Sequence, residues 1–237
     1  MIRKGEPWGR PAMGPPDLEV RGSDADLAAA VGGRRGARIR FVPDATSDVA
    51  RAVGLAAPRG DAAVVVPAGN AETVTELPVD ALLVDSSPVD RPGREVEQLA
   101  LNMVVVGIAP DRLRWWHRRR PCAVEIDGRA VFEGRATTVV VANGQFLRGL
   151  DLVPRGHPGD GRSEVQTYAM GPAARRPMRR RLPTGDHVPH PDIRQHTGRT
   201  ASILFSAPRP VEIDGAASGA RAEVEVRIAP EALVLLV

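Results

Sequence analysis

The acidic residues that stand next to glycine are the first places in this sequence where chemistry could occur. The pentapeptide Val-Glu-Ile-Asp-Gly occurs twice, at 124–128 and at 211–215. A carboxylate held on such a turn could be the remnant of a catalytic site, because a fixed carboxylate can serve as a general base. Asp-Gly after alternating residues is also a signal for a β-hairpin turn. The flanks of the two copies do not match, so we interpret them as hairpin turns and not as an internal repeat.

Histidine residues offer a second set of groups for chemistry. His187, His190 and His196 could together hold a metal ion, since imidazole is a common metal ligand. The alternative is that they are loop histidines, because no predicted helix or strand fixes His187 and His190 as a pair. Cys122 is the single cysteine, which excludes an internal disulfide and any multi-cysteine metal site.

A basic segment with two adjacent tryptophans is the third candidate. The stretch "DRLRWWHRRRP" (111–121) surrounds the tryptophans with arginines. Indole rings beside guanidinium groups suit an anionic membrane surface or a phosphate backbone. The alternative is a solvated basic turn with one tryptophan packed inward, although adjacent side chains cannot both face one core. As a surface for a lipid substrate or a membrane we predict Trp115, Trp116, Arg118, Arg119 and Arg120.

The composition limits the classes of protein and of chemistry. The 237 residues are 43% hydrophobic, enough for a globular protein with a sizeable core. No apolar run approaches the length of a membrane span, and the basic start lacks the apolar segment of a secretory signal, so we expect a cytoplasmic protein that is at most peripheral to a membrane. Lys4 is the only lysine, which argues against a P-loop or a catalytic lysine. Aromatic residues are only 3% and no RNP-type motif occurs, so no nucleic-acid partner is expected.

The predicted elements divide the chain into two parts. Helices at 23–33 and 44–55 and strands at 37–43 and 61–69 form an α/β pattern. After about residue 79, strand-like segments separated by Gly, Pro and Asp are typical of an antiparallel sandwich or barrel. A helix is expected at 171–182, which Pro177 should break or kink. The fold class is therefore α+β with two domains, namely a truncated α/β nucleotide-binding-like domain at 1–78 and an antiparallel β-sandwich at 79–237.

Several short motifs follow one another in a characteristic order. They are "GSDAD" (22–26), "VPDATSDVARAVGL" (42–55), "VVVANGQF" (139–146), "PRGHPGDGRSEVQTYAM" (154–170), "TGDHVPHP" (184–191) and "APRPVEIDGA" (207–216). This succession resembles the bacterial diacylglycerol kinase and lipid kinase family over roughly residues 20–237. The resemblance implies a nucleotide domain followed by a β-sandwich, and ATP-dependent phosphorylation of a lipid hydroxyl with Mg²⁺ as a cofactor.

The resemblance also implies a nucleotide site, although its loops are altered here. The family's Gly-Gly-Asp-Gly-Thr loop corresponds to 22–26, and its Pro-x-Gly-Thr-x-Asn-Asp segment corresponds to 43–48. By this correspondence the nucleotide contacts would be Gly22, Ser23, Asp24, Thr46, Ser47 and Asp48. Ala25 restricts the loop and Asp26 adds a negative charge facing phosphate. The start of the second helix would still offer N–H donors to an anion.

A structural magnesium site is implied near the Asp160-Gly161 pair. The side chain of Asp160 would be the acidic ligand, and the backbone carbonyls of His157 and Arg162 would be its neighbours. The alternative is that Asp160-Gly161 is only a hairpin turn.

The most consequential difference from the family lies after the second pentapeptide. The family's Val-Asp-Gly-Glu supplies a glutamate as general base, whereas Ala216 stands here and no carboxylate follows at 217–220. Loss of a general base typically lowers the rate by about 10²–10⁴. We therefore predict Asp24 and Asp214 as catalytic residues of a weakly active or inactive lipid kinase, a possible pseudoenzyme. The alternative is a non-catalytic lipid- or partner-binding regulatory protein on the same fold.

The segment before Gly22 is shorter than the strand–helix–strand portion that precedes this loop in the family. We expect the first part of the nucleotide domain to be missing or to be supplied by another chain. The sequence leaves a homodimer open.

Overall fold

The smaller lobe of the molecule is built on a parallel strand pair joined by a helix. A computed structural model describes residues 8–32, 34–55, 74–86 and 96–237. Strands β2 (Leu18–Gly22) and β3 (Ala37–Pro43) are parallel, and α1 (Asp24–Gly32) connects them. These elements agree with the predicted helix at 23–33 and strand at 37–43. The strand predicted at 61–69 lies outside the described residues.

The second helix is shorter than the sequence pattern suggests. Helix α2 covers Asp48–Ala52, and residues before it form a turn in which the Asp44 carboxylate accepts hydrogen bonds from the Thr46 N–H and hydroxyl, both at 2.7 Å. Ser47 caps the helix, since its hydroxyl accepts from the Ala50 N–H at 2.9 Å. Local side-chain hydrogen bonds of this kind delay the start of a helix.

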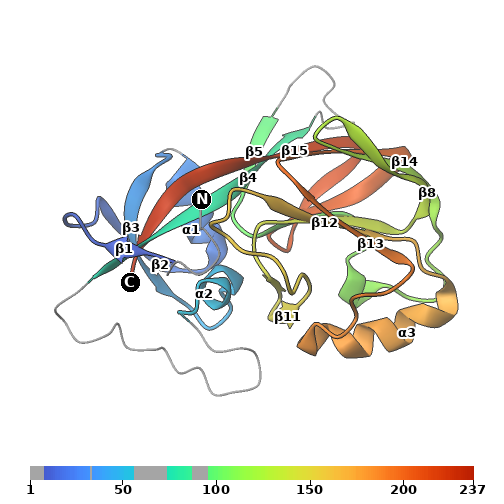
Figure 1. Cartoon of the computed structure of the whole chain (residues 1–237), viewed down its shortest axis with the longest axis horizontal. Helices are drawn as coiled ribbons and strands as arrows, with labels where there is room; N and C mark the ends of the chain where they lie inside the picture. The colour runs from blue at the N-terminus through green and yellow to red at the C-terminus, as the bar shows by residue number, and fades with distance from the viewer. Residues whose placement is uncertain (1–7, 33, 56–73, 87–95) are drawn as a thin grey trace.

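Two long strands connect the smaller lobe with the larger one. Strand β4 (Thr75–Ser86) runs antiparallel to β15 (Ala216–Leu236), and the end of β15 pairs in parallel with β3. Strand β1 (Arg10–Pro11) pairs with the start of β4. Figure 1 shows β4 and β15 extending along the length of the molecule. Because both strands belong to both lobes, the predicted boundary between residues 78 and 79 falls inside β4 and stays a prediction.

The larger lobe is a sandwich of antiparallel strands. Within the described residues, thirteen strands form one hydrogen-bonded network whose main path is β1-β4-β15-β14-β6-β9-β12-β13. Its remaining strands are β5 (Val96–Ala100), β6 (Met103–Gly107), β7 (Arg120–Ile126), β8 (Arg129–Ala136), β9 (Thr138–Ala142), β12 (Ser163–Tyr168), β13 (Ile193–Gly198) and β14 (Thr200–Ile213). Strand β14 pairs with β7 in its first part and with β6 in its last part, so it passes from one layer to the other. A small second sheet holds β10 (Phe146–Leu147) and β11 (Leu150–Asp151).

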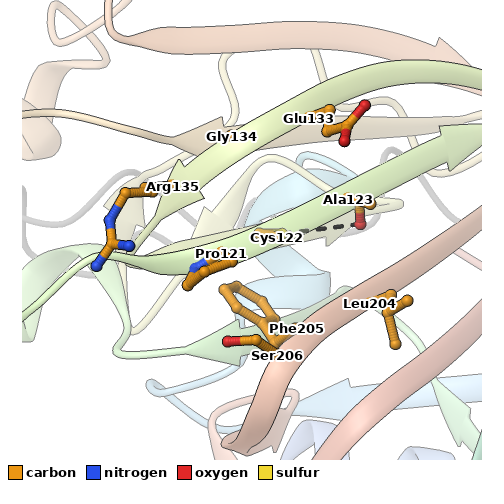
Figure 2. A pocket seen from close by; sticks show the side chains of 9 residues that line it. All are labelled: Pro121, Cys122, Ala123, Glu133, Gly134, Arg135, Leu204, Phe205 and Ser206. Atoms are coloured by element: carbon orange, nitrogen blue, oxygen red, sulfur yellow. Dashed lines mark hydrogen bonds between the residues drawn. The ribbon is translucent and has the colours of Figure 1, made fainter.

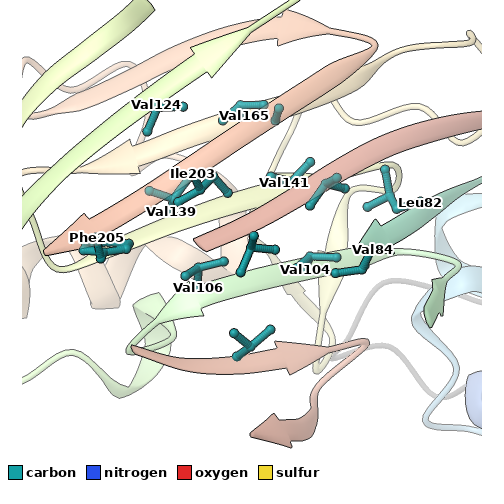
Figure 3. Packing of buried hydrophobic residues seen from close by; sticks show 14 of the residues in the cluster. Leu82, Val84, Val104, Val106, Val124, Val139, Val141, Val165, Ile203 and Phe205 are labelled. Atoms are coloured by element: carbon teal, nitrogen blue, oxygen red, sulfur yellow. The ribbon is translucent and has the colours of Figure 1, made fainter. Parts of the chain in front are cut away.

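The main core lies between the two layers of the sandwich. Valines of β6 and β9, among them Val104 and Val141, pack against Val124 of β7 and Ile203 of β14 (Figure 3). The opposite faces of β6 and β9 pack against a second cluster that includes Tyr168 and residues of α3. Strands buried on both faces need the continuous apolar runs that these two segments contain.

Helix α3 (Pro172–Arg181) is continuous, so Pro177 does not break it, and the alternative that Pro177 kinks the helix stays a prediction. A proline removes one backbone donor and crowds one carbonyl of the preceding turn. Arg175 and Met178 are buried whereas Pro177 is exposed, so the anchored face of the helix is intact. Two short 3₁₀ turns, η1 (Pro110–Arg112) and η2 (Leu182–Thr184), complete the fold. In the described part of the chain, no helix has the length and apolar character needed to cross a bilayer.

Candidate functional site

A cleft of about 530 Å³ lies where the smaller lobe meets the β14–β15 hairpin. Its lining comes from α1, from β5 and from the hairpin. Ala25 and Ala28 of α1 face Gln98 of β5 and Ala216 of the hairpin across it. The fold therefore brings the altered glycine loop and the second pentapeptide together, as the resemblance implies.

Asp214 anchors the hairpin to the neighbouring loop. It has φ 47° and Gly215 has φ 82°, while Ile213 pairs with Ala216, as in a type I′ turn. The carboxylate accepts hydrogen bonds from the N–H groups of Leu101 at 2.7 Å, Asn102 at 2.9 Å and Met103 at 2.7 Å. Burial raises the pKa of Asp214 to about 6, although these three donors act in the opposite direction. The Asp214 carboxylate thus serves as an acceptor for the backbone N–H groups of residues 101–103.

The first pentapeptide makes the same kind of turn at another place. Asp127 has φ 50° and Gly128 has φ 74°, and Ile126 pairs with Arg129. The Asp127 carboxylate accepts hydrogen bonds from the N–H groups of Arg199 and Thr200, both at 2.9 Å. Both pentapeptides are therefore hairpin turns, as predicted, and only the second lines the cleft.

Asp24 lies at the start of α1 and caps α2. One oxygen accepts from the Ser47 hydroxyl, and the other accepts from the N–H groups of Asp48 at 2.8 Å and Val49 at 3.1 Å. Burial raises the pKa of Asp24, while the Ser47 hydrogen bond and the two N–H groups oppose this. The charge of Asp24 also contributes, after burial, to the raised pKa of Asp214.

The Asp26 side chain in the first turn of α1 forms hydrogen bonds with the loop before the helix. The Asp26 carboxylate accepts from the Ser23 N–H at 2.8 Å and from the Ser23 hydroxyl at 2.7 Å, and these bonds lower the pKa of Asp26. Gly22 has φ 125°, and a Cβ atom there would lie 2.5 Å from an Asp26 oxygen. The Ser23 N–H is therefore bonded to Asp26, and the N–H groups of Asp48 and Val49 at the start of α2 are bonded to Asp24. In this arrangement these three N–H groups are engaged, so a nucleotide phosphate could reach them only if the Asp26 and Asp24 carboxylates moved away.

The other predicted nucleotide contacts have structural partners. Thr46 is exposed and bonded to Asp44. The Asp48 carboxylate accepts from the Gly149 N–H at 2.7 Å and from the Arg148 N–H, and pairs with Arg51 at 3.2 Å. Asp48 thus joins α2 to the turn between β10 and β11.

Sequence reasoning missed a charged network that begins at this turn. The Arg148 guanidinium bridges Asp111 at 2.7 Å and Glu212 at 2.8 Å, and Glu212 also pairs with Arg112 at 2.9 Å. Glu212 stands two residues before Asp214, so the network connects α2 with the hairpin of the cleft. The only local signal was the Arg148-Gly149 pair, which forms a turn with φ 52° and 70°.

Of the predicted magnesium ligands, the Asp160 carboxylate makes a hydrogen bond within its own loop. The Asp160 carboxylate accepts from the Arg162 N–H at 2.9 Å. The His157 ring packs edge-on against Trp8, with centroids 4.8 Å apart, and its Nδ1 accepts from the Gly159 N–H at 3.2 Å. Across residues 8–237, gaps excepted, no group of three or more His, Cys, Asp or Glu side chains is placed to hold a metal ion. The magnesium site stays a prediction of the resemblance.

The three histidines of the loop prediction occupy different environments. His187 is buried, its Nε2 lies 3.4 Å from the Tyr168 hydroxyl, and burial lowers its pKa to about 4. His190 accepts from the Asp192 N–H at 3.0 Å, and His196 lies in β13. Within the described residues, none of the three belongs to a group of three or more His, Cys, Asp or Glu side chains that could hold a metal ion.

A second hollow, of about 670 Å³, lies over β7, β8 and the outer side of β14. Figure 2 shows its charged groups, Glu133 and Arg135, at opposite ends of the hollow. Burial raises the pKa of the Cys122 thiol to about 12, so this cysteine is a poor nucleophile at neutral pH. These features give the second hollow no evident chemistry.

Solved structures of a diacylglycerol kinase and of an NADH kinase share the fold of this chain. A candidate diacylglycerol kinase from Bacillus anthracis str. Sterne has a TM-score of 0.70 at 17% identity, over 93% of this chain and 78% of that one. A diacylglycerol kinase of the same organism has a TM-score of 0.66 at 19% identity, over 93% and 76% of the two chains. A yeast NADH kinase complexed with NADH has a TM-score of 0.55 at 12% identity, over 93% and 61%. These similarities confirm the predicted fold class, with a β-sandwich as the C-terminal part.

The family follows from the sequence of the larger lobe. Residues 92–237, more than half of the chain, match the family described as "YegS C-terminal NAD kinase beta sandwich-like domain". The chain belongs to this family, which agrees with the lipid-kinase resemblance of its motifs. No curated protein matches the chain.

Proposed function

We propose that this chain is a lipid-kinase relative in which ATP-dependent phosphorylation of a lipid hydroxyl, such as that of diacylglycerol, is slow or lost. The observation that carries the proposal is the position of Ala216. Its methyl group lines the cleft between α1 and the β14–β15 hairpin, where the family resemblance expects a glutamate as general base. A methyl group cannot take a proton from a lipid hydroxyl.

No neighbouring group takes over this role. Among the described residues that line the cleft, Asp214 is the only carboxylate, and it accepts three backbone N–H groups. The Gln98 side-chain oxygen accepts from the Ser218 hydroxyl at 2.6 Å and from the Arg221 guanidinium at 3.2 Å. An amide and a guanidinium are not bases at neutral pH. The described side chains that line the cleft therefore offer no free carboxylate for proton abstraction.

Restoring the carboxylate is the direct test. We would compare the wild type, Ala216→Glu and the control Ala217→Glu in transfer of labelled phosphate from Mg-ATP to diacylglycerol in mixed micelles. Ala217 also lines the cleft, so the control places the same charge in the cleft but one residue away from the expected position of the base. We expect Ala216→Glu to exceed the wild type by about 10²–10⁴ and Ala217→Glu to stay at the wild-type rate. Equal turnover by the wild type and Ala216→Glu would refute a role for this position.

A second candidate function is a non-catalytic protein that binds a lipid or a partner on the same fold. The observation that favours it is Asp26, whose carboxylate occupies the Ser23 donors in the loop where a phosphate would bind. Calorimetric titration with Mg-ATP and Mg-ADP distinguishes the two functions. Micromolar binding supports the kinase relative, because the loop must then open for nucleotide. No binding at millimolar nucleotide, together with inactive Ala216→Glu, supports the non-catalytic protein.

A further inference from the structure

We propose that the segment 114–120 and the outer side of α3 form one surface that binds an anionic lipid bilayer. We call it the tryptophan–arginine surface, and it consists of Arg114, Trp115, Trp116, Arg118, Arg119 and Arg120 of the segment with Arg176, Arg180 and Arg181 of α3. The proposal goes beyond the function proposed above and does not depend on phosphotransfer.

Both tryptophan side chains face solvent. Trp115 is 72% exposed and Trp116 is 56% exposed, and their rings meet edge to face at 5.5 Å. Leu113 is the residue of this segment that packs into the core, with no exposed area. The alternative of one tryptophan packed inward is therefore wrong. Two adjacent exposed indoles are an unusual apolar area for a surface that meets only water.

The segment is held in place by α3. The buried Arg175 donates to the carbonyls of Arg114 at 2.7 Å, Trp115 at 3.3 Å and His117 at 2.5 Å. Arg179 donates to the carbonyl of Leu113, and the Arg114 N–H donates to His117 Nδ1 at 3.0 Å. The backbone of the tryptophan turn is thereby fixed while the indoles point outward, so little conformational entropy is lost when they insert. Figure 1 shows α3 at the opposite end of the molecule from the C-terminus.

The charged side chains of the tryptophan–arginine surface are all positive. No Asp or Glu occurs in residues 112–124 or 171–185. Arg112 pairs with Glu212, but among the described residues none of the arginines of the tryptophan–arginine surface takes part in an ion pair. Burial and then the nearby cations Arg175 and Arg114 lower the pKa of His117. The segment and the helix therefore share a positive field, which calls for an anionic partner.

A bilayer fits these features better than a nucleic acid or a protein. Indole rings favour the boundary between lipid headgroups and acyl chains, and arginines beside them contact lipid phosphates. Nucleic-acid surfaces instead use aromatic faces on which bases stack, whereas these two rings stand edge to face. Asp111 and Arg112 lie shortly before the segment, and their ion pairs with Arg148 and Glu212 join them to the hairpin of the cleft. A bilayer bound here would lie next to the elements that carry the cleft.

The test is co-sedimentation of the full chain with vesicles of phosphatidylcholine, with and without about a third of phosphatidylglycerol. The variants are Trp115→Ser with Trp116→Ser, and Arg118→Glu. The matched controls are Leu204→Ser, an exposed apolar residue of β14, and Arg129→Glu, an exposed arginine of β8. We expect at least a tenfold preference of the wild type for the anionic vesicles. Each test variant should lose about tenfold or more, and each control should bind as the wild type does.

Several results would overturn the proposal. Equal binding to both vesicle types would show that charge does not drive the binding. An equal loss of vesicle binding in Leu204→Ser and in the tryptophan variant would show that the tryptophan–arginine surface is not the binding surface. Tighter binding to a single-stranded oligonucleotide than to anionic vesicles would assign the surface to nucleic acid. Thermal unfolding of each variant shows whether it is folded, and the exposed positions should leave the unfolding temperature within a few degrees. Because no nucleotide is present, a failed kinase assay has no bearing on this result.

Discussion

Asp214 should act as a backbone anchor whose loss costs far more stability than loss of its counterpart Asp127. Both residues occupy the same position of a Val-Glu-Ile-Asp-Gly hairpin, so the pair is a matched comparison within one chain. The perturbations are Asp214→Ala and Asp127→Ala. Each removes a carboxylate at a position of positive φ, so the strain of alanine there is common to both variants and cancels in the comparison.

The expected loss in the free energy of unfolding follows from the number of N–H donors that each carboxylate accepts. Asp214 accepts three N–H groups of residues 101–103, whereas Asp127 accepts two exposed N–H groups. A hydrogen bond to a charged acceptor contributes about 1.5–3 kcal/mol. Burial offsets part of this for Asp214, as its raised pKa shows. We therefore expect a loss of about 3 kcal/mol for Asp214→Ala and about 1 kcal/mol for Asp127→Ala, where water can replace the carboxylate.

The assay is thermal and urea unfolding of the wild type and both variants at pH 7.5, followed by circular dichroism. For a chain of this size, 1 kcal/mol shifts the melting temperature by about 2–4 °C, so the expected shifts are about 6–12 °C and about 2–4 °C. Equal shifts would refute the reasoning. An unchanged melting temperature in Asp214→Ala, together with loss of any phosphotransfer gained by Ala216→Glu, would instead make Asp214 a catalytic residue.

Two further predictions concern titratable side chains of the sandwich. Burial, followed by the charge of Asp160, raises the pKa of Glu164 to about 7. Because the folded chain favours the protonated carboxyl, Glu164 contributes fully to stability below about pH 4.5, and this contribution is lost as the pH rises through 7. Glu164→Gln should therefore gain stability relative to the wild type between pH 5 and pH 8 in urea unfolding, and a difference independent of pH would contradict this cause. Burial raises the pKa of Cys122 to about 12, so a thiol reagent should modify it only in urea; rapid modification of the folded chain at pH 8 would show that the thiol is accessible.

Local patterns predicted the elements whose conformation depends on adjacent residues. The Asp-Gly pairs of both pentapeptides form tight hairpins because glycine and aspartate tolerate positive φ. Helix α1 and strand β3 follow the predicted ranges within one residue. The sequence also showed that an alanine, Ala216, follows the second hairpin turn, because this depends only on the order of residues along the chain.

Contacts between distant segments were decided only in three dimensions. The end of β15 pairs with β3, nearly the whole chain away, and Asp214 bonds the backbone of residues 101–103. No sequence period encodes such partners, since they depend on how the lobes pack and not on local propensity. The hydrogen bonds from Ser23 to the Asp26 carboxylate join residues close in sequence, yet the sequence predicted instead that Asp26 faces a phosphate. A sequence does not contain the hydrogen-bond geometry that distinguishes the two arrangements. Residue types along the chain thus determined the hairpins and the alanine at position 216, while packing decided which carboxylates anchor backbone and how α3 holds the tryptophan turn.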